Sequence, residues 1–411
     1  MRWLGVAALA VLLVLPAFVT SYVVTLLIFI FFYAYLGQAW NIIGGYAGQL
    51  SVGHAAFVGV GGYTSAMLSM QAGITPWLGL FVGGVLSALL GAVIGFLAFR
   101  FGLRGFYFVL LTVAFAEICR ITALNTEAIG GALGLYITFT GDPAQFQFQD
   151  NRVYNYVALA LLLVAAGVVA LIERRRFGVY LAAIREDEMA AEALGVDAFR
   201  YKMLAMIVSS FLTGLGGTFY AYYLFSLQPN AVFGIPLSVE IVIRPIVGGA
   251  GTLPGPILGA FILSPLQELS RLYFSTGGLH GAHLIAYGVL LIVVVLFLPH
   301  GAYPFPATSV GAGEGVTVLL EARGISKWFG GLHAVKDLSF AVGEGEIVAL
   351  IAPNGAGKTT VFSLLSGFLR PDAGEVRFRG RSLAGARPHE IVALGLARTF
   401  QIVRPFPRLS V

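Results

Sequence analysis

The chain has 411 residues, of which 58% are apolar and 11% are charged, and its formal net charge is +5. An ordinary soluble domain carries about 25% charged residues, so this composition excludes a wholly water-soluble protein and indicates a membrane protein. The single cysteine, Cys119, excludes an internal disulfide, and no Cys/His cluster suggests zinc. The basic residues lie in loops between apolar runs, so they indicate membrane topology and not a nucleic-acid partner.

Long apolar runs predict a polytopic α-helical membrane domain over residues 1–298. The first run follows Arg2 as in a signal peptide, but no small-x-small cleavage site follows, so we expect an uncleaved helix. Basic loops after the fourth and sixth runs place both termini in the cytoplasm. About ten spans are predicted, at 3–20, 22–43, 53–70, 76–99, 106–124, 153–172, 201–225, 236–248, 255–273 and 282–298.

The composition changes after residue 298. Residues 299–317 are rich in Pro and Gly and are interpreted as a linker. Residues 318–411 have ordinary charge and are predicted to form part of an α/β domain. Within them, 319–326 and 337–342 alternate like half-buried strands, and 346–351 is a short apolar run typical of a buried strand.

The predicted buried strand leads directly into a phosphate-binding loop of the P-loop type. Successive backbone N–H groups of such a loop point at phosphate oxygens, and the following helix adds its positive dipole end. Lys358 is expected to reach the β- and γ-phosphates, and the Thr359 hydroxyl to ligate Mg²⁺. One position departs from the motif, since Ala352 stands where a glycine is usual. The alternative is a chance glycine turn before a helix. The predicted nucleotide-binding residues are Asn354, Gly355, Ala356, Gly357, Lys358, Thr359 and Thr360.

The words PNGAGKTT and RTFQ (398–401), with Phe329 placed 29 residues before Lys358, resemble the ATP-binding subunit of ABC transporters. FGGLHAVKDLSF and LARTFQIVRPF are most similar to ATPases of branched-chain amino acid importers. The resemblance implies that ATP and Mg²⁺ are the cofactors, that Phe329 stacks on adenine, and that Gln401 approaches Mg²⁺ and the γ-phosphate. It also implies a signature motif, an Asp-Glu strand and a switch histidine after Gln401, where ten residues remain. We therefore expect that this chain does not hydrolyse ATP alone.

Three stretches of the membrane half, at 40–64, 115–121 and 246–260, resemble the permease of the same importers. The resemblance implies a permease fused to an ATP-binding subunit in the bacterial inner membrane, with the ATP-binding part in the cytoplasm. The implied cargo is a branched-chain amino acid or a similar small polar solute such as urea or an amide. The implied partners are a second permease subunit, a second ATP-binding subunit, an extracytoplasmic substrate-binding protein and membrane lipid. The alternatives are an ABC exporter half-unit, or a nucleotide-binding membrane protein with a vestigial ATPase domain.

Two glycine-rich stretches and one pair of ionisable residues mark the membrane half. Gly44–Gly48 (the first glycine segment) and Gly248–Gly251 (the second glycine segment) permit either helix unwinding or close helix packing. Glu117 and Arg120 share one helix face at i, i+3. They are interpreted either as a structural ion pair or as groups on the substrate path that attract an ammonium and a carboxylate. Arg244 is open to the same two interpretations, and a third is that its side chain extends to the membrane surface.

Residues 184–197, IREDEMAAEALGVD, predict a short cytoplasmic helix that Gly195 ends. The stretch resembles the coupling loop by which importer permeases dock on their ATPase. The alternative is an amphipathic helix on the membrane surface. If this helix docks beside Gln401, the acidic residues Glu186, Glu188 and Glu192 would meet a basic cluster at 398–408, and we expect Glu186 or Glu188 to contact Arg404. The alternative is that Arg404 and Arg408 are solvated or pair elsewhere in the ATP-binding domain.

Overall fold

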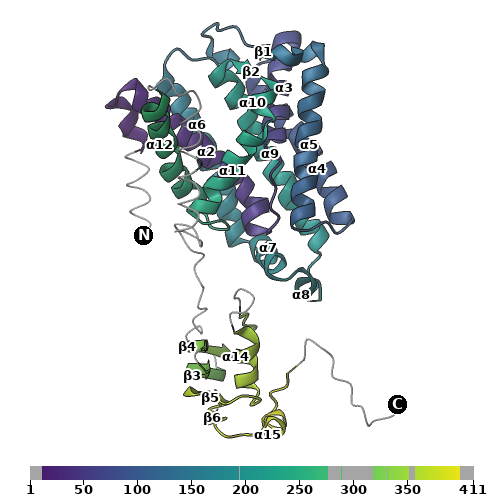
Figure 1. The fold of residues 1–411 in the computed structure, drawn as a ribbon, viewed down its shortest axis with the longest axis vertical. Helices are drawn as coiled ribbons and strands as arrows, with labels where there is room; N and C mark the ends of the chain where they lie inside the picture. The colour runs from purple at the N-terminus through teal and green to yellow at the C-terminus, as the bar shows by residue number, and fades with distance from the viewer. Residues whose placement is uncertain are drawn as a thin grey trace. The chain divides into compact units, whose positions relative to one another are not determined.

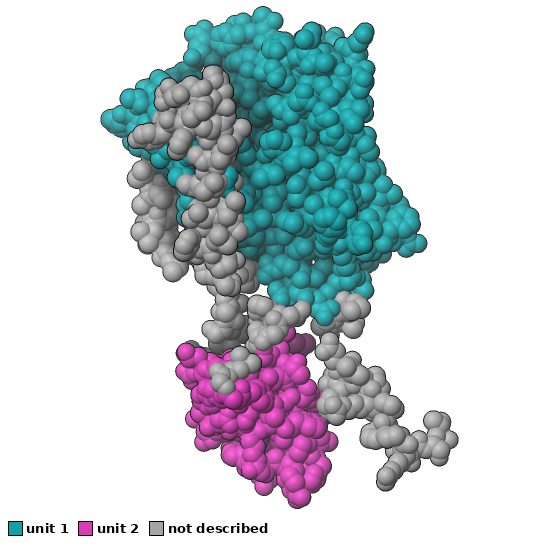
Figure 2. All heavy atoms as spheres, viewed as in Figure 1, with its two compact units in different colours: residues 1–305 teal, residues 306–411 magenta. Residues whose placement is uncertain are grey.

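The computed structural model describes residues 12–193, 195–275, 288, 318–330, 332–350 and 357–398. The chain divides into two compact units, residues 1–305 and 306–411 (Figure 2). The predicted linker 299–317, the predicted span 3–20 up to residue 11, and the predicted span 282–298 apart from residue 288 lie outside the described residues.

The described part of the first unit is built mainly from helices, most of them joined by short loops, with a longer connection between α5 and α6 (Figure 1). Two short strands, β1 (Leu135–Tyr136) and β2 (Ser226–Leu227), pair antiparallel at one end of it, and α7 and α8 lie together at the opposite end. The helices are α2 (Ser21–Asn41), α3 (Ala55–Ala72), α4 (Pro76–Arg100), α5 (Phe106–Asn125), α6 (Asn151–Arg174), α7 (Arg176–Glu186), α8 (Glu188–Ala193), α9 (Ala198–Leu224), α10 (Pro229–Val232), α11 (Ile235–Gly248) and α12 (Gly255–Ser275). Short 3-10 turns occur at Leu15–Ala17, Glu127–Ile129, Gly131–Leu133 and Pro143–Gln145.

The predicted count of about ten spans is not supported. Among the described residues, six segments are long and apolar enough to cross a membrane: Ser21–Tyr46, Pro76–Arg100, Phe106–Asn125, Asn151–Arg174, Ala198–Leu224 and Pro229–Gly248. The predicted spans 53–70 and 255–273 form helices α3 and α12, but these do not meet the same criterion. Both are diluted by small and polar residues, which suits packing against other helices better than contact with lipid.

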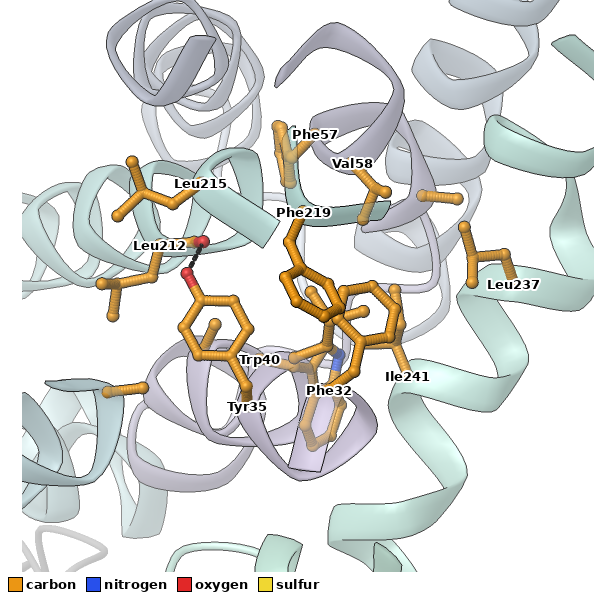
Figure 3. Packing of buried hydrophobic residues seen from close by; sticks show 14 of the residues in the cluster. Phe32, Tyr35, Trp40, Phe57, Val58, Leu212, Leu215, Phe219, Leu237 and Ile241 are labelled. Atoms are coloured by element: carbon orange, nitrogen blue, oxygen red, sulfur yellow. Dashed lines mark hydrogen bonds between the residues drawn. The ribbon is translucent and has the colours of Figure 1, made fainter. Parts of the chain in front are cut away.

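Helices α2 and α9 lie at the centre of the first unit, because 72% and 67% of their most apolar stretches are buried. Their contact is aromatic: the Phe32 and Phe219 rings stack with centroids 5.4 Å apart, and the Tyr35 hydroxyl donates to the carbonyl of Leu212 (Figure 3). Trp40, further along α2 than Tyr35, donates from its indole N–H to the carbonyl of Ser51 at 2.7 Å. Phe32, Tyr35, Trp40 and Phe219 thus pack together at the centre of the unit, and the polar groups of Tyr35 and Trp40 are satisfied.

Helix α5 is peripheral, since only 22% of its most apolar stretch is buried. Helix α4 also presents large apolar residues outward, at spacings of three and four that form one helix face. These residues are Leu78, Phe81, Val85, Leu89, Val93 and Phe96. An apolar outer face of this kind is what contact with hydrocarbon requires.

The second unit contains one antiparallel sheet of order β4-β3-β5-β6, with two helices among its described residues. The core is formed mainly by Leu320, Ile325, Val361, Leu364 and Phe378. The elements are β3 (Val318–Phe329), β4 (Leu332–Gly343), α14 (Lys358–Leu365), β5 (Ala373–Phe378), β6 (Arg381–Ser382) and α15 (Pro388–Ala393).

The strands predicted at 319–326 and 337–342 are confirmed as parts of β3 and β4. The strand predicted at 346–351 is wrong for its described residues, 346–350, which form no regular structure. Ile347 is 97% exposed there. A strand needs a neighbour to accept and donate its ladder hydrogen bonds, and no described strand lies beside this run.

Candidate functional site: a phosphate-binding helix and a junction of glycine segments

The predicted phosphate-binding helix is α14, which begins at Lys358 with Gly357 as its N-cap. Gly357 has φ +84°, and a Cβ built on it would lie 2.1 Å from the carbonyl oxygen of Ala334. Both the backbone conformation and the close approach to β4 therefore require glycine at this position. Residues 354–356 of the motif, Asn354, Gly355 and Ala356, lie outside the described residues.

Lys358, Thr359 and Thr360 form the first turn of α14. The first hydrogen bond within this helix runs from the N–H of Val361 to the carbonyl of Gly357, at 2.9 Å. The N–H groups of a first turn have no acceptor inside their helix and lie at the positive end of the helix dipole. This turn therefore fits a phosphate group, and phosphate binding here stays a prediction.

Arg398 connects the end of the described chain to α14. Its guanidinium donates to the hydroxyls of Ser363 and Ser366 at 3.1 and 3.3 Å. Arg398 opens the stretch RTFQ, so this contact holds the beginning of that stretch against the phosphate-binding helix. Gln401 itself lies outside the described residues.

Phe329 ends strand β3, and its side chain is 47% exposed, which leaves ring surface for a ligand to stack on. The strand end is fixed by Asp372, which accepts from the Lys327 ammonium at 2.7 Å and from the Trp328 N–H at 2.8 Å. These two hydrogen bonds lower the pKa of the Asp372 carboxyl. The sequence analysis did not identify this clamp, because Asp372 lies 45 positions from Lys327.

Glu117 and Arg120 form the predicted ion pair on α5. The Nε of Arg120 donates to Oε2 of Glu117 at 2.9 Å, and its Nη1 donates to Oδ1 of Asn230 on α10 at 2.6 Å. The side chains are 43% and 25% exposed. A groove of about 270 Å³ with a mainly apolar lining lies between α3 and α5. Two of its lining residues, Ile118 and Cys119, stand between Glu117 and Arg120 in the sequence. Its lining includes Val60, Tyr63, Ile118, Cys119, Thr122 and Phe233.

The two glycine segments, far apart in the chain, contact each other directly. The first overlaps the π-helical turn Ile42–Tyr46 that follows α2, and the second begins at the last residue of α11. Asn41 joins them, since its Oδ1 accepts from the N–H of Gly251 at 2.7 Å and its Nδ2 donates to the carbonyl of Thr252 at 2.9 Å. A Cβ at Gly45 would lie 1.9 Å from Asn41 Oδ1 and 2.4 Å from the Gly251 nitrogen. Both interpretations, interrupted helices and close packing, therefore hold here.

Glu173, at the end of α6, reinforces this contact, which we call the glycine junction (Asn41, Gly45, Glu173 and Gly251). Its Oε1 accepts from the Tyr46 hydroxyl at 2.5 Å and from the N–H of Leu253 at 3.2 Å. The sequence analysis missed Asn41 and Glu173. The signal available for Asn41 was a polar amide in an apolar run, directly before the first glycine segment.

The predicted coupling loop, residues 184–197, contains the last residues of α7 and all of α8, with Asp187 between the two helices. Gly195 follows with φ +87°, and Glu192 is exposed. Glu186 pairs with Arg185 at 3.3 Å. Glu188 does not fit the expected contact with Arg404. It is 11% exposed and pairs within its own unit with Lys202 at 2.5 Å and Arg104 at 3.2 Å. Arg404 lies outside the described residues.

Of the interpretations of Arg244, the one in which it reaches the membrane surface is wrong. Its side chain is fully buried between α2, α11 and α12, and its guanidinium carbon lies 3.6 Å from the centre of the Tyr33 ring. It donates to the carbonyl of Glu240 at 2.6 Å and to Oε1 of Gln267 at 3.0 Å. A guanidinium with these partners is satisfied inside the unit and has no need of water.

Comparison with known proteins assigns both units. Residues 22–298 match the family model described as "Branched-chain amino acid transport system / permease component", and residues 335–411 match the model described as "ABC transporter". The chain is 28% identical over 310 residues to the high-affinity branched-chain amino acid transport system permease protein LivM of Salmonella typhimurium, covering 69% of this chain and 70% of that protein.

The second unit has its own relatives. It is 48% identical over 93 residues to the ATP-binding protein LivG of Salmonella typhimurium and 43% identical over 93 residues to a probable LivG of Archaeoglobus fulgidus. Each match covers 23% of this chain and 36% of the relative, so the chain spans about a third of the length of these ATP-binding proteins. The chain is a multi-pass membrane protein with an ABC ATP-binding region, and it belongs to the family of branched-chain amino acid transport system permease components.

Proposed function

We propose that this chain is the combined permease and ATP-binding component of an ABC importer in a bacterial inner membrane. Its proposed cargo is a branched-chain amino acid or a similar small polar solute. The observation that carries the proposal is the presence, on one chain, of a multi-span permease of this family and a helix start that fits a nucleotide phosphate. Relatives of the two units are named as the permease and ATP-binding proteins of one transport system, which supports the same conclusion.

The first turn of α14 would hold the nucleotide. Backbone N–H groups near Gly357 would bind the phosphates, Lys358 would balance their charge, and Thr359 would ligate Mg²⁺. Phe329 offers an exposed ring for the adenine, and Asn354, Gly355, Ala356, Thr360 and Gln401 would complete the site. Bound ATP supplies the free energy of the transport cycle, and this chain contributes its binding and orientation.

One face of helix α5 is proposed to line the substrate path. Glu117 and Arg120 lie on a face that is partly exposed at membrane depth, where an ion pair is costly unless it meets water, a ligand or another subunit. Their carboxylate and guanidinium match the ammonium and carboxylate of a zwitterionic amino acid. The neighbouring groove is mainly apolar and suits a branched aliphatic side chain. We infer that this face of α5 meets the second permease subunit.

The remaining proposed partners are a second ATP-binding subunit, an extracytoplasmic substrate-binding protein and the surrounding lipid. Residues 1–298, 299–317 and 318–411 are the proposed permease, linker and ATP-binding regions, with the last in the cytoplasm. In this arrangement α7 and α8, which carry Glu186 and Glu192, are the proposed contact with the ATP-binding subunit.

Uptake into liposomes tests the function. The complex isolated through a tag on this chain is reconstituted with ATP on the side of the ATP-binding unit. The substrate-binding protein and radiolabelled leucine, isoleucine and urea are added on the opposite side. We expect ATP-dependent uptake of leucine or isoleucine that is lost in Lys358→Ala. Uptake of urea alone would change the assigned cargo. ATP-dependent movement in the opposite direction would indicate an exporter, and no ATP-dependent movement would overturn the proposal.

A further inference from the structure

Arg185, in the last turn of α7, reaches the first glycine segment. Its Nη1 donates to the carbonyl of Gly45 at 2.9 Å, across 140 positions in the chain. The aliphatic part of the side chain lies against Gly48, where an added Cβ would be 2.6 Å from Arg185 Cγ. The carbonyl of Gly45 belongs to the π-helical turn at the C-terminal end of α2. A cation is favoured at that end, because the helix dipole is negative there.

The same guanidinium also lies against the second glycine segment. A Cβ built on Gly251 would be 2.4 Å from Nη1 of Arg185, so the guanidinium occupies the space that any larger residue at 251 would need. A guanidinium is planar and carries five N–H donors, which suits a position between two backbone segments. Arg185 is 23% exposed and therefore largely enclosed by this contact. The Arg185 side chain of α7 thus contacts both glycine segments.

In the described structure, the partners of Glu186 and Glu188 lie outside the two glycine segments. Glu188 is held by Lys202 and Arg104, and Glu186 pairs with Arg185 itself. A displacement of α7 therefore pulls directly on the carbonyl of Gly45 through Arg185. It also changes the space beside Gly251. The two segments end α2 and α11, so a movement at this point alters the ends of two helices together.

We propose that Arg185 is a positioning residue that transmits displacement of the α7–α8 pair to both glycine segments, and so couples nucleotide binding to rearrangement of the membrane helices. The transport direction and cargo rest on the proposed function above. The contact of one guanidinium with both segments is independent of them.

Hydrogen exchange tests the contact separately from transport. In the complex isolated through a tag on this chain, amide exchange is measured for peptides covering 43–53 and 249–255, with and without ATP. In Arg185→Gln we expect both peptides to exchange about five- to tenfold faster without nucleotide, as loss of a charged hydrogen bond predicts. We also expect the ATP-dependent change in exchange seen in the wild type to be lost. Arg185→Lys should restore part of both effects.

The control is Arg200→Gln, which removes a guanidinium that is 80% exposed and paired with Asp197 near the same helices. It should leave both peptides unchanged. Unchanged exchange in Arg185→Gln, or faster exchange in one peptide alone, would overturn the proposal. So would a variant whose solute uptake per ATP hydrolysed equals that of the wild type despite faster exchange. If the wild type carries no tested solute, the importer assignment fails, while the ATP-dependent exchange still decides the role of Arg185.

Discussion

Lys202 of α9 and Glu188 of α8 form an ion pair with an Nζ–Oε1 distance of 2.5 Å, and their side chains are only 3% and 11% exposed. Arg104 contacts the other carboxylate oxygen at 3.2 Å. The Lys202 ammonium also lies 5.0 Å from the centre of the Phe99 ring. The short helix α8 is therefore fastened to the loop after α4 and to α9. Its acidic residue at 188 supports the fold of the first unit.

Removing Lys202 should destabilise the first unit. In Lys202→Met the carboxylate of Glu188 stays largely buried with Arg104 as its remaining partner, and we expect a loss of about 2–3 kcal/mol, less than for a buried charge left with none. Adding Glu188→Leu should recover most of it. Arg200→Ala, at an exposed pair, should cost less than about 0.5 kcal/mol. Thermal unfolding of the purified protein, monitored through the labelling of Cys119, measures these changes. Equal melting temperatures for Lys202→Met and Arg200→Ala would contradict the prediction.

A methyl group at Gly45 should be poorly tolerated. It would lie 1.9 Å from Asn41 Oδ1 and 2.4 Å from the Gly251 nitrogen, so the glycine junction must separate to admit it. We expect Gly45→Ala to lower the stability of the first unit by about 1–3 kcal/mol, the usual cost of overpacking. Gly167→Ala is the matched control. Gly167 lies within α6 with nothing near its Cβ position, so this change should stabilise by roughly 0.5–1 kcal/mol. Thermal melts that rank the two variants in the opposite order would refute the close contact.

The ion pair on α5 should affect substrate more than stability. Glu117 and Arg120 are partly exposed, so Glu117→Gln with Arg120→Gln should leave stability nearly unchanged. If the pair lies on the substrate path, uptake should show a raised KM. Asn230→Ala, which removes the third member of this contact, is expected to have a smaller effect of the same kind. An unchanged KM in the double variant would identify the pair as structural.

Gly357→Ala should abolish nucleotide binding by the second unit. The new Cβ would lie 2.1 Å from the Ala334 carbonyl, so the start of α14 must move away from β4. Gly380→Ala provides a control with the same backbone strain, because Gly380 has φ +75° but nothing near its Cβ position. Binding of a fluorescent ATP analogue should be lost in the first variant and retained in the second. Similar affinities in both would show that the helix start is not the phosphate site.

Local sequence determined much of this protein. The apolar runs predicted the membrane helices over 76–100 and 106–125 almost to their ends, because hydrocarbon thickness and hydropathy act on contiguous residues. The pattern around Gly357 predicted the start of α14, and the i, i+3 spacing predicted the pair of Glu117 and Arg120. Each of these features depends on residues within one helix or one turn.

Tertiary structure decided the rest. The burial of Arg244 against Tyr33, the capture of Glu188 by Lys202, and the contact of Arg185 with Gly45 depend on helices brought together from distant parts of the chain. The span count depended on it too, since α3 and α12 are helices whose small and polar residues suit packing against neighbours. The sequence alone does not show whether a charged side chain contacts water, lipid or another side chain. The free energy of each choice is set by neighbours that only helix packing supplies.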